Sequence, residues 1–519
     1  MKKNFLFLLL ILIVFNSCSR QEESEPAEKP LITLSVCLKK PYFSSFFPPA
    51  LQYVNDSHLY ELIYNTLISA NYSGRLLPEI AKCWTISPDM KEYTFILRKN
   101  VKFHNGKRLT VDDVIFTYKQ LIIHAHEQYA ELSYIEGIDD FIAGKTETIR
   151  GLEKIDSFTF KIKLRQKFKY FLHFLSSKVT SVIPADFGGA SKSEFLEHPI
   201  GSGPFKFQSK QPEINTFKFT KNKDYFANTG NVDEVILCLP KKETELETLL
   251  TFDLFVKDIT MTHGQKDFLA DRTIINTPRD LETFVAINPK ENPSLQHREN
   301  RQLINYSINR ERLVDVLHSR NYIPAHSIIP VNLFGHNPYY RIHYLQTKKM
   351  EELLKKNPIT FTLLINHGQR KVAEFLREDL KKINVNLEII AVDARTYSKK
   401  ISKPVKLNYS FIVNGSADYP SPYNFLNQLY GSDGTLNYFE VNSPQVTDLI
   451  STLPTTDIKG EINTLSLINK SIEEESLYIP LYYYANVIVM KGNIKKVLFK
   501  YPSIINFSSI EVETRRKTR

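Results

Sequence analysis

Few residues in this 519-residue sequence have the types and the spacing that chemistry requires. His124, His126 and Glu127 are metal-binding side chains, but two histidines at a polar helix end are more often solvated surface groups. Gly144-Lys145-Thr146 looks like the end of a phosphate-binding loop, yet Asp139 stands where that loop needs its first glycine. We therefore expect no metal site and no nucleotide site.

The carboxylate pairs and the glycine-rich turn do not indicate catalysis either. Neighbouring residues on a helix face different directions, so Asp112-Asp113 and Asp139-Asp140 are not natural acid and base couples. The turn Gly201-Ser202-Gly203-Pro204 could hold an anion, but a tight turn where the chain crosses between domains is the simpler interpretation. The sequence has no Gly-x-Ser-x-Gly, His-Glu-x-x-His or Gly-x-Gly-x-x-Gly motif, so it predicts neither an enzyme nor a cofactor.

Hydrophobic periodicity predicts a mixture of strands and helices around these residues. The expected strands are 31–37, 93–97, 158–164, 360–365, 386–392, 410–413 and 486–490. The expected helices are 56–68, one that begins at Thr110, 301–317, 370–383 and 461–475. Thr110 and Asp113 form a capping-box pattern, which favours a helix start at that point. Mixed strands and helices with long polar connections indicate α/β or α+β domains.

The composition describes an ordinary globular protein of about three domains. Aromatic residues are frequent, with 34 Phe and 27 Tyr, but there is only 1 Trp. The chain is 42% hydrophobic and 24% charged, and its net charge of +10 is dispersed, so we expect no nucleic-acid partner. Four cysteines exclude a disulfide scaffold, and a single short apolar run excludes a polytopic membrane protein.

The N-terminus has the pattern of a secretory signal that ends in a lipid attachment site. Lys2 and Lys3 precede an apolar run over 5–15, which as a helix would span only about half of a bilayer core. A small residue followed by Cys18 resembles a bacterial lipoprotein box, although Phe15 stands where leucine is usual. We expect a cleaved signal with lipid on Cys18; the alternative is an uncleaved or differently cleaved signal with a free thiol.

The signal and lipidated cysteine, residues 1–18, precede a polar, proline-broken stretch over 19–30 that we interpret as a flexible tether. The remaining cysteines are Cys37, Cys83 and Cys238, which are odd in number. At most one intramolecular disulfide can form among them, and three separate thiols are an equal alternative.

Seven blocks of sequence carry a resemblance to a known family. They are 77–89 (LPEIAKCWTISPD), 93–114 (YTFILRKNVKFHNGKRLTVDDV), 138–145 (IDDFIAGK), 199–205 (PIGSGPF), 300–310 (NRQLINYSINR), 417–422 (ADYPSP) and 479–484 (IPLYYY). In this order they resemble the oligopeptide-binding proteins of bacterial ABC importers, solute-binding family 5. The resemblance covers nearly everything from residue 31 onward.

The resemblance implies an α/β, two-lobed periplasmic binding protein fold of type II, in the large cluster with an inserted extra domain. Lobe I is expected over 31–76, 200–280 and 485–519, with the inserted domain over 77–199. Lobe II is expected over 281–484. Ligand would bind in the cleft between the lobes, and closure about a hinge would bury it.

The resemblance also implies side chains that hold a peptide. Its α-ammonium group needs a buried carboxylate, and the family's carboxylate matches Asp418. The alternative for this residue is a turn-forming aspartate before Pro420. Tyr129 and Tyr484 fall where tyrosines of the family touch peptide, although either could be an ordinary, partly buried tyrosine.

Two strand-like edges would bind the peptide backbone without regard to its side chains. One edge falls on Gln52 to Val54, just before the first helix. The other falls on Asn414, Gly415 and Ser416, just before the Ala-Asp-Tyr motif.

Several positions depart from the family pattern. Tryptophans of the family that line side-chain pockets fall on Ala394 and Gly415, and the single Trp84 belongs to a sequence block away from the pocket. We therefore expect a wider or less aromatic pocket. Lys403 and His367 would be available for a carboxylate terminus, unless Lys403 is simply a solvated surface residue.

These inferences predict a lipid-anchored periplasmic receptor, a monomer, that binds short peptides and delivers them to an ABC permease and its ATPase. It would contain no metal or cofactor and perform no chemistry. One alternative within the same fold is a receptor for cell-wall peptides, nickel chelates or haem, because a fold does not determine its ligand. Another is a surface-exposed interaction protein without a transport role.

Overall fold

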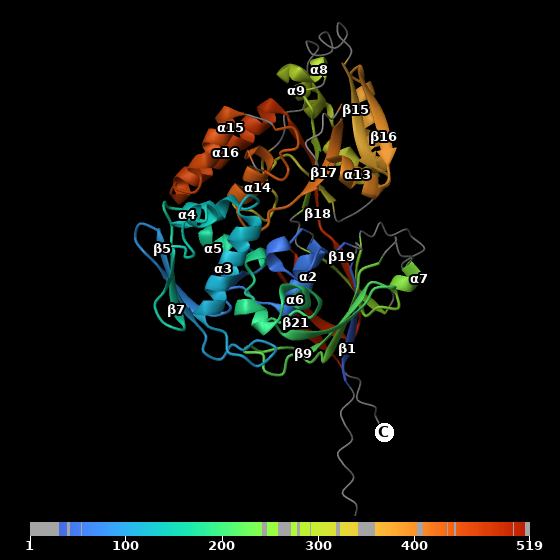
Figure 1. Ribbon diagram of the computed structural model, residues 1–519. Helices are drawn as coiled ribbons and strands as arrows, with labels where there is room; N and C mark the ends of the chain where they lie inside the picture. The colour runs from blue at the N-terminus through green and yellow to red at the C-terminus, as the bar shows by residue number, and fades with distance from the viewer. Residues whose placement is uncertain are drawn as a thin grey trace, which may run out of the picture.

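The computed structural model describes residues 31–513, apart from 39–41, 53, 241–245, 258–270, 278–280, 291, 318–321, 341–358, 402–407, 433, 441–442 and 502. Figure 1 shows two bodies, one above the other, with segments from distant parts of the sequence in each. Within the described part of the chain, no helix is long and apolar enough to cross a membrane.

The lower body in Figure 1 contains a seven-stranded sheet with the order β12-β19-β11-β1-β10-β9-β8. Its strands are β1 (Thr33–Cys37), β8 (Phe205–Gln211), β9 (Thr216–Lys221), β10 (Glu234–Cys238), β11 (Leu254–Lys257), β12 (Arg272–Asn276) and β19 (Val487–Lys491). β1 is parallel to β10 and β11, and the other pairs are antiparallel. Alternate residues of β9 and β10 pack against α2 (Val54–Ile63) and the hairpin of β20 (Ile494–Lys500) and β21 (Ile504–Val512).

Beside this sheet lies an antiparallel four-stranded sheet with the order β4-β5-β7-β6. Its strands are β4 (Ala81–Ile86), β5 (Glu92–Leu97), β6 (Leu152–Lys154) and β7 (Thr159–Lys163). The helix α3 (Val111–Ala125) packs its apolar residues into the same core, and the predicted capping box is confirmed by Thr110 and Asp113. Short elements follow as η2 (Ala130–Tyr134), α4 (Ile138–Ile142), α5 (Phe171–Phe174), η3 (Lys178–Thr180), η4 (Ala185–Gly189) and α6 (Lys192–Glu197).

The upper body contains a six-stranded sheet with helices on both faces. Its order is β14 (Tyr322–Pro324), β18 (Tyr478–Tyr484), β13 (Leu281–Ala286), β17 (Ser410–Gly415), β15 (Ile359–Asn366) and β16 (Val385–Val392). Val285 packs with α8 (Pro293–Gln296), α9 (Arg298–Ser307), α10 (Arg310–Val316) and α12 (Arg370–Lys381). Its neighbour Phe284 faces the side of α13 (Ala394–Ile401), α14 (Pro422–Tyr430), α15 (Pro444–Thr452) and α16 (Ile458–Glu475).

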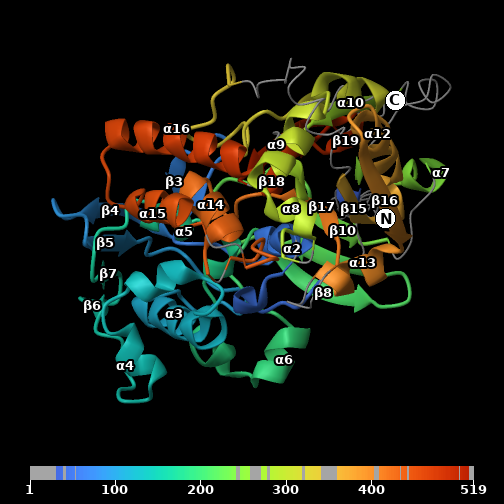
Figure 2. The same cartoon turned by 90° about the horizontal axis from the view of Figure 1, so that it is seen from above.

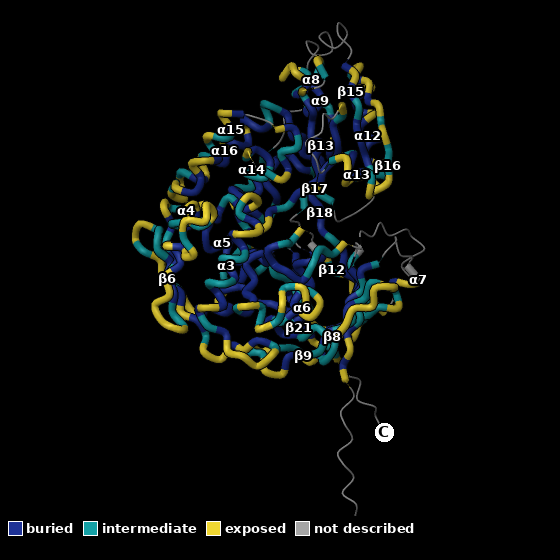
Figure 3. Tube along the Cα trace, viewed as in Figure 1, coloured by how far each residue is buried: buried dark blue, intermediate teal, exposed yellow. Residues whose placement is uncertain are grey.

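The helices α14, α15 and α16 separate the sheet from solvent on one side. Figure 2 shows them side by side from above. In Figure 3 the outer surfaces of α15 and α16 are exposed, whereas β13, β17 and β18 to their right are buried. The helix α14 therefore lies inside the molecule, where it faces the lower body.

Two neighbouring stretches of chain connect the bodies: β12 leads into β13, and β18 leads into β19. They are hydrogen-bonded to each other. The Thr277 N–H donates to the Asn486 carbonyl at 2.9 Å, and the Asn486 N–H donates to the Thr277 hydroxyl at 2.9 Å. Such a paired crossing is a suitable hinge, because small changes in backbone angles there move whole bodies.

The predicted helix 56–68 is wrong beyond Ile63, where α2 ends. The Gly203 N–H donates to the Ile63 carbonyl at 2.7 Å, and an added Cβ on Gly203 would lie 2.4 Å from the Ile63 carbonyl carbon. The glycine turn thus packs directly on the helix end, as a structural turn. The chain continues as β2 (Ile68–Ala70), which pairs with β3 (Leu76–Pro78).

The predicted helix 301–317 is two helices, α9 and α10. Asn309 begins the second one, because its side-chain oxygen accepts a hydrogen bond from the Arg312 N–H at 2.9 Å. The Arg310 guanidinium donates to the Ile308 carbonyl at 3.2 Å, which the end of α9 leaves free. The other predicted elements are confirmed within a few residues, and η1 (Pro48–Ala50), α7 (Leu246–Leu249) and η7 (His367–Gln369) complete the fold.

Candidate ligand-binding cavity

A partly enclosed cavity of about 170 Å³ lies where the two bodies meet. Its described lining comes from residues 51–52 ahead of α2, residues 128–131 at the start of η2, and six residues in or near α14: Asp418, Asn424, Asn427, Gln428, Gly434 and Thr435. Figure 1 shows α14 directly above the helices α3 and α5 of the lower body. The cavity therefore combines parts of the chain that are hundreds of residues apart.

The sequence that starts α14 determines which side chains reach the cavity. Pro422 is the first helical residue, where its fixed backbone angle suits the helix, and the Ser421 hydroxyl accepts a hydrogen bond from the Asn424 N–H at 3.4 Å. Asn424 and Gln428 are one turn apart and share a face of the helix. There the Gln428 side-chain amide donates to the side-chain oxygen of Asn424 at 2.9 Å.

Asp418 is held by this pair of amides. Its backbone N–H donates to the side-chain oxygen of Asn424 at 2.8 Å, and its carboxylate accepts a hydrogen bond from the Gln428 amide at 3.1 Å. The Asp418 side chain is exposed, and it faces the cavity whose lining it helps to form. Enclosure, and next the negative charge of Glu131, raise the pKa of Asp418 to about 6.

Glu131 is a second carboxylate in the lining, and it is only 3% exposed. The Tyr419 hydroxyl donates a hydrogen bond to it across the boundary between the bodies, and the Asn424 side chain is a further partner. Burial raises the pKa of Glu131, and these hydrogen bonds offset part of the rise. Burial and the charges of Asp418 and Glu131 also raise the pKa of Tyr129 well above its ordinary value, so both carboxylates act on this ring.

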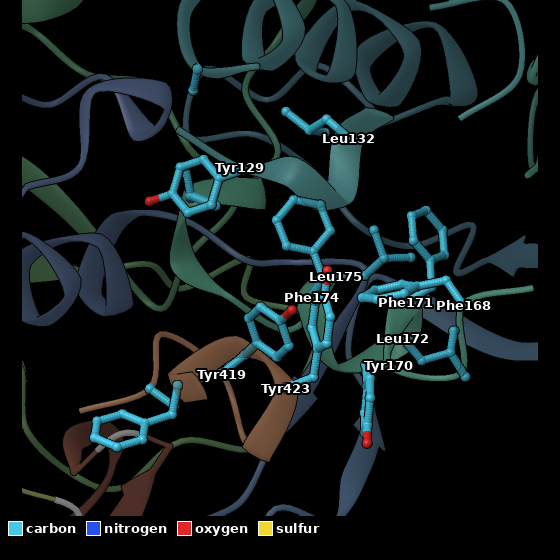
Figure 4. Packing of buried hydrophobic residues seen from close by; sticks show 14 of the residues in the cluster. Tyr129, Leu132, Phe168, Tyr170, Phe171, Leu172, Phe174, Leu175, Tyr419 and Tyr423 are labelled. Atoms are coloured by element: carbon cyan, nitrogen blue, oxygen red, sulfur yellow. The ribbon is translucent and has the colours of Figure 1, made fainter. Parts of the chain in front are cut away.

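Aromatic rings from both bodies pack together beside the carboxylates. Figure 4 shows Tyr419 and Tyr423 facing rings of the lower body. The ring centroids of Tyr419 and Phe174 are 5.9 Å apart, and Tyr423 stacks on Tyr170 at 5.8 Å. This contact packs the two bodies together next to the cavity, because the Tyr419 hydroxyl also donates to Glu131 in the lining.

The chemistry of the cavity is that of cation binding. The lining residues that the structure describes include Asp418, Glu131 and several side-chain amides, but no lysine, arginine or histidine. Two carboxylates without a cation, surrounded by hydrogen-bonding amides, provide a site for a positively charged, hydrogen-bonding ligand.

His124 and His126 have structural roles. Each ring bonds through Nδ1 to a backbone carbonyl of its own helix, that of Gln120 at 2.8 Å and that of Ile122 at 2.7 Å. Across the described ranges, no group of three or more His, Cys, Asp or Glu side chains could hold a metal ion. The cysteines Cys37, Cys83 and Cys238 are free thiols.

Three predicted site residues, Asp418, Gln52 and Tyr129, meet in the cavity. Val54 does not have the extended conformation expected of an edge, because it is the first residue of the helix α2. Tyr484 lies opposite Leu281 in the six-stranded sheet and is not part of the described cavity lining.

Asn414 and Gly415 are also away from the described lining, at the end of β17. The Asn414 side chain accepts a hydrogen bond from the Thr283 hydroxyl at 2.9 Å, and an added Cβ on Gly415 would touch Phe284 at 3.1 Å. Gly415 therefore belongs to the interior packing of the sheet, whereas Asn414 is exposed at the strand end.

Ser416 lies just after that strand and His367 is exposed at the start of η7; neither lines the described cavity. Cys18 and Lys403 lie outside the described residues.

Glu131, Asn424 and Gln428 were not predicted. The Ser421-Pro422 start of α14 could have indicated that Asn424 and Gln428 share a face with each other. Nothing in the local sequence distinguishes Glu131 from a solvated glutamate, since its burial depends on Tyr419, 288 residues further along the chain.

Sequence comparison assigns the family. The family model described as "Bacterial extracellular solute-binding proteins, family 5 Middle" matches residues 75–437 of this chain. The chain belongs to this family. Family 5 proteins have the two-lobed α/β fold of periplasmic binding proteins, so the two bodies described above are its lobes.

Individual relatives agree in fold and differ in their named ligands. The family 5 chain is 25% identical over 404 residues to di/tripeptide-binding protein 1 of Pseudomonas aeruginosa, covering 72% of this chain and 74% of the relative. It is 26% identical to haem-binding protein A of Haemophilus influenzae, covering 78% and 79%. The structure of the periplasmic binding protein DppA from Helicobacter pylori, solved with the peptide STSA, aligns with a TM-score of 0.76 at 22% identity, covering 93% and 98%.

Proposed function

We propose that this protein captures short peptides in the cavity between its lobes and delivers them to an ABC permease. The observation that carries the proposal is Asp418, a carboxylate that lines the cavity and has a raised pKa, with no cationic side chain in the described lining. Relatives named for peptide binding support the same ligand class.

The physical argument concerns the peptide's α-ammonium group. Taking an ammonium group out of water costs several kcal/mol unless a carboxylate and further hydrogen-bond acceptors receive it. Asp418 supplies the charge, and the side-chain amides of Gln52, Asn424 and Gln428 belong to the same lining. Because these groups contact what every peptide has, they bind peptides without reading most of the side chains.

The domain boundaries proposed from the sequence are supported by sheet membership. Strands of the seven-stranded sheet come from 31–76, 200–280 and 485–519, those of the four-stranded sheet from 77–199, and those of the six-stranded sheet from 281–484. Closure would rotate 281–484 about the paired crossing at Thr277 and Asn486.

The proposal includes a cellular location. Residues 1–18 would direct export and leave lipid on Cys18, and residues 19–30 would tether the lobes to the membrane. The protein would act as a monomer in the periplasm, next to the permease and ATPase that receive the peptide.

Mass spectrometry of the ligands released from purified protein tests the ligand class. Peptides with free N-termini are expected, whereas recovery of haem or a nickel chelate alone would overturn the proposal. Asp418→Ala should weaken peptide binding by at least about tenfold, because it removes the charged partner of the ammonium group. Calorimetric titration with one defined peptide measures this loss, and an unchanged affinity would contradict the role of Asp418.

A further inference from the structure

The cavity contains one carboxylate more than a peptide's N-terminus needs. A single α-ammonium group carries one positive charge, and Asp418 already balances it. Glu131 lines the same cavity and is only 3% exposed. It contributes a second negative charge that no part of the family resemblance assigns to the ligand.

The described partners of Glu131 are neutral. The Tyr419 hydroxyl donates a hydrogen bond to it, and Asn424 is an amide partner. Two other buried carboxylates of the molecule do have cations: Lys169 Nζ lies 2.6 Å from Glu461 Oε2, and Arg312 Nη2 lies 2.6 Å from Asp379 Oδ1. Glu131 therefore has hydrogen bonds that orient it, but no described side chain that neutralises it.

The two carboxylates are close enough to oppose each other. The charge of Glu131 is the second cause of the raised pKa of Asp418, after enclosure. Both charges also act on the ring hydroxyl of Tyr129. A ligand with one positive charge relieves this repulsion only in part, whereas a ligand with two positive charges at one end balances both carboxylates.

We infer that Glu131 selects peptides whose first residue carries a second positive charge, such as lysine, arginine or ornithine. Asp418 binds the α-ammonium group, and Glu131 binds the cationic end of the first side chain. The inference rests on the proposed function, since it concerns which peptides the same cavity prefers.

The test compares two tripeptides by calorimetry with the full protein: Lys-Ala-Ala, and the same peptide with its lysine Nζ acetylated. Wild type should bind the charged peptide at least about tenfold tighter, since a charge-assisted hydrogen bond is lost on acetylation. Glu131→Gln should remove this preference while it keeps an oxygen that accepts the Tyr419 hydrogen bond. The control Glu127→Gln changes an exposed carboxylate nearby in the sequence and should retain the preference.

The possible results separate the two claims. Equal binding of both peptides by wild type would overturn the role of Glu131 and leave peptide capture intact. A preference that persists in Glu131→Gln would also overturn it. If wild type binds neither peptide, nor Ala-Ala-Ala as a third ligand, the proposed function itself is wrong.

Discussion

Two pairs of neighbouring carboxylates in this protein, Glu61 with Glu79 and Asp418 with Glu131, differ in the charged groups that face them. Glu61 and Glu79, in the lower lobe, lie between two lysines. Lys178 Nζ is 2.5 Å from Glu61, and Lys500 Nζ is 2.8 Å from Glu61 and 2.6 Å from Glu79. Asp418 and Glu131, in the cavity, have amides and tyrosines around them but no described cation.

The electrostatic consequences are opposite. Burial by itself would raise the pKa of Glu79, but Lys500 and Lys178 outweigh it and hold that pKa at about 2. Burial also raises the pKa of Asp418, and there the nearest charge adds to the rise, so that it reaches about 6. The comparison teaches that burial alone does not define a binding site. Lysines of the chain itself balance the charges of Glu61 and Glu79, whereas a ligand can supply the cation that Asp418 and Glu131 lack among the described residues.

The largest expected effect on stability comes from removing Lys500, which pairs with both Glu61 and Glu79. Lys500→Met leaves two buried carboxylates with only Lys178, and it should lower the free energy of unfolding by about 3–5 kcal/mol. Chemical denaturation measures this loss. Lys496→Met is the matched control, because Lys496 is in the same strand and forms an exposed ion pair with Glu511, worth at most about 1 kcal/mol. Equal losses of unfolding free energy in the two variants would show that the buried ion pairs stabilise the protein no more than an exposed ion pair does.

A smaller effect is expected in the pH dependence of folding stability, where Glu79 and Asp418 should act in opposite directions. Glu79 has a lowered pKa when folded, so it contributes stability above about pH 4 that is lost as the pH falls through about 2. Asp418 has a raised pKa when folded, so its contribution to folding stability is present below about pH 4 and is lost as the pH rises through about 6.

Thermal unfolding of the ligand-free protein between pH 4 and 8 checks this difference. At pH 8, Asp418→Asn should unfold at a higher temperature than wild type, and Glu79→Gln at a lower one. The gain from Asp418→Asn should shrink as the pH falls below about 6. Shifts of the same sign in both variants would mean that the cavity carboxylate is already balanced within the protein.

Local sequence signals predicted the parts of the fold that depend on local contacts. Thr110 and Asp113 indicated the start of α3 because a capping box involves residues three apart. The end of α2 at Ile63 was not predictable in this way, because the Gly203 N–H from a distant turn donates a hydrogen bond to the Ile63 carbonyl. The site divides similarly: Asp418 could be predicted from its motif, whereas Glu131 becomes part of the site only through Tyr419 on the other lobe.

The central claim is that the ligand supplies the cation that the cavity lacks. The most direct measurement is a calorimetric titration of wild type with Lys-Ala-Ala carrying either a free or an acetylated N-terminus. The account predicts that acetylation weakens binding by at least about tenfold, because Asp418 then faces a neutral amide. Equal affinity for the two peptides would contradict it.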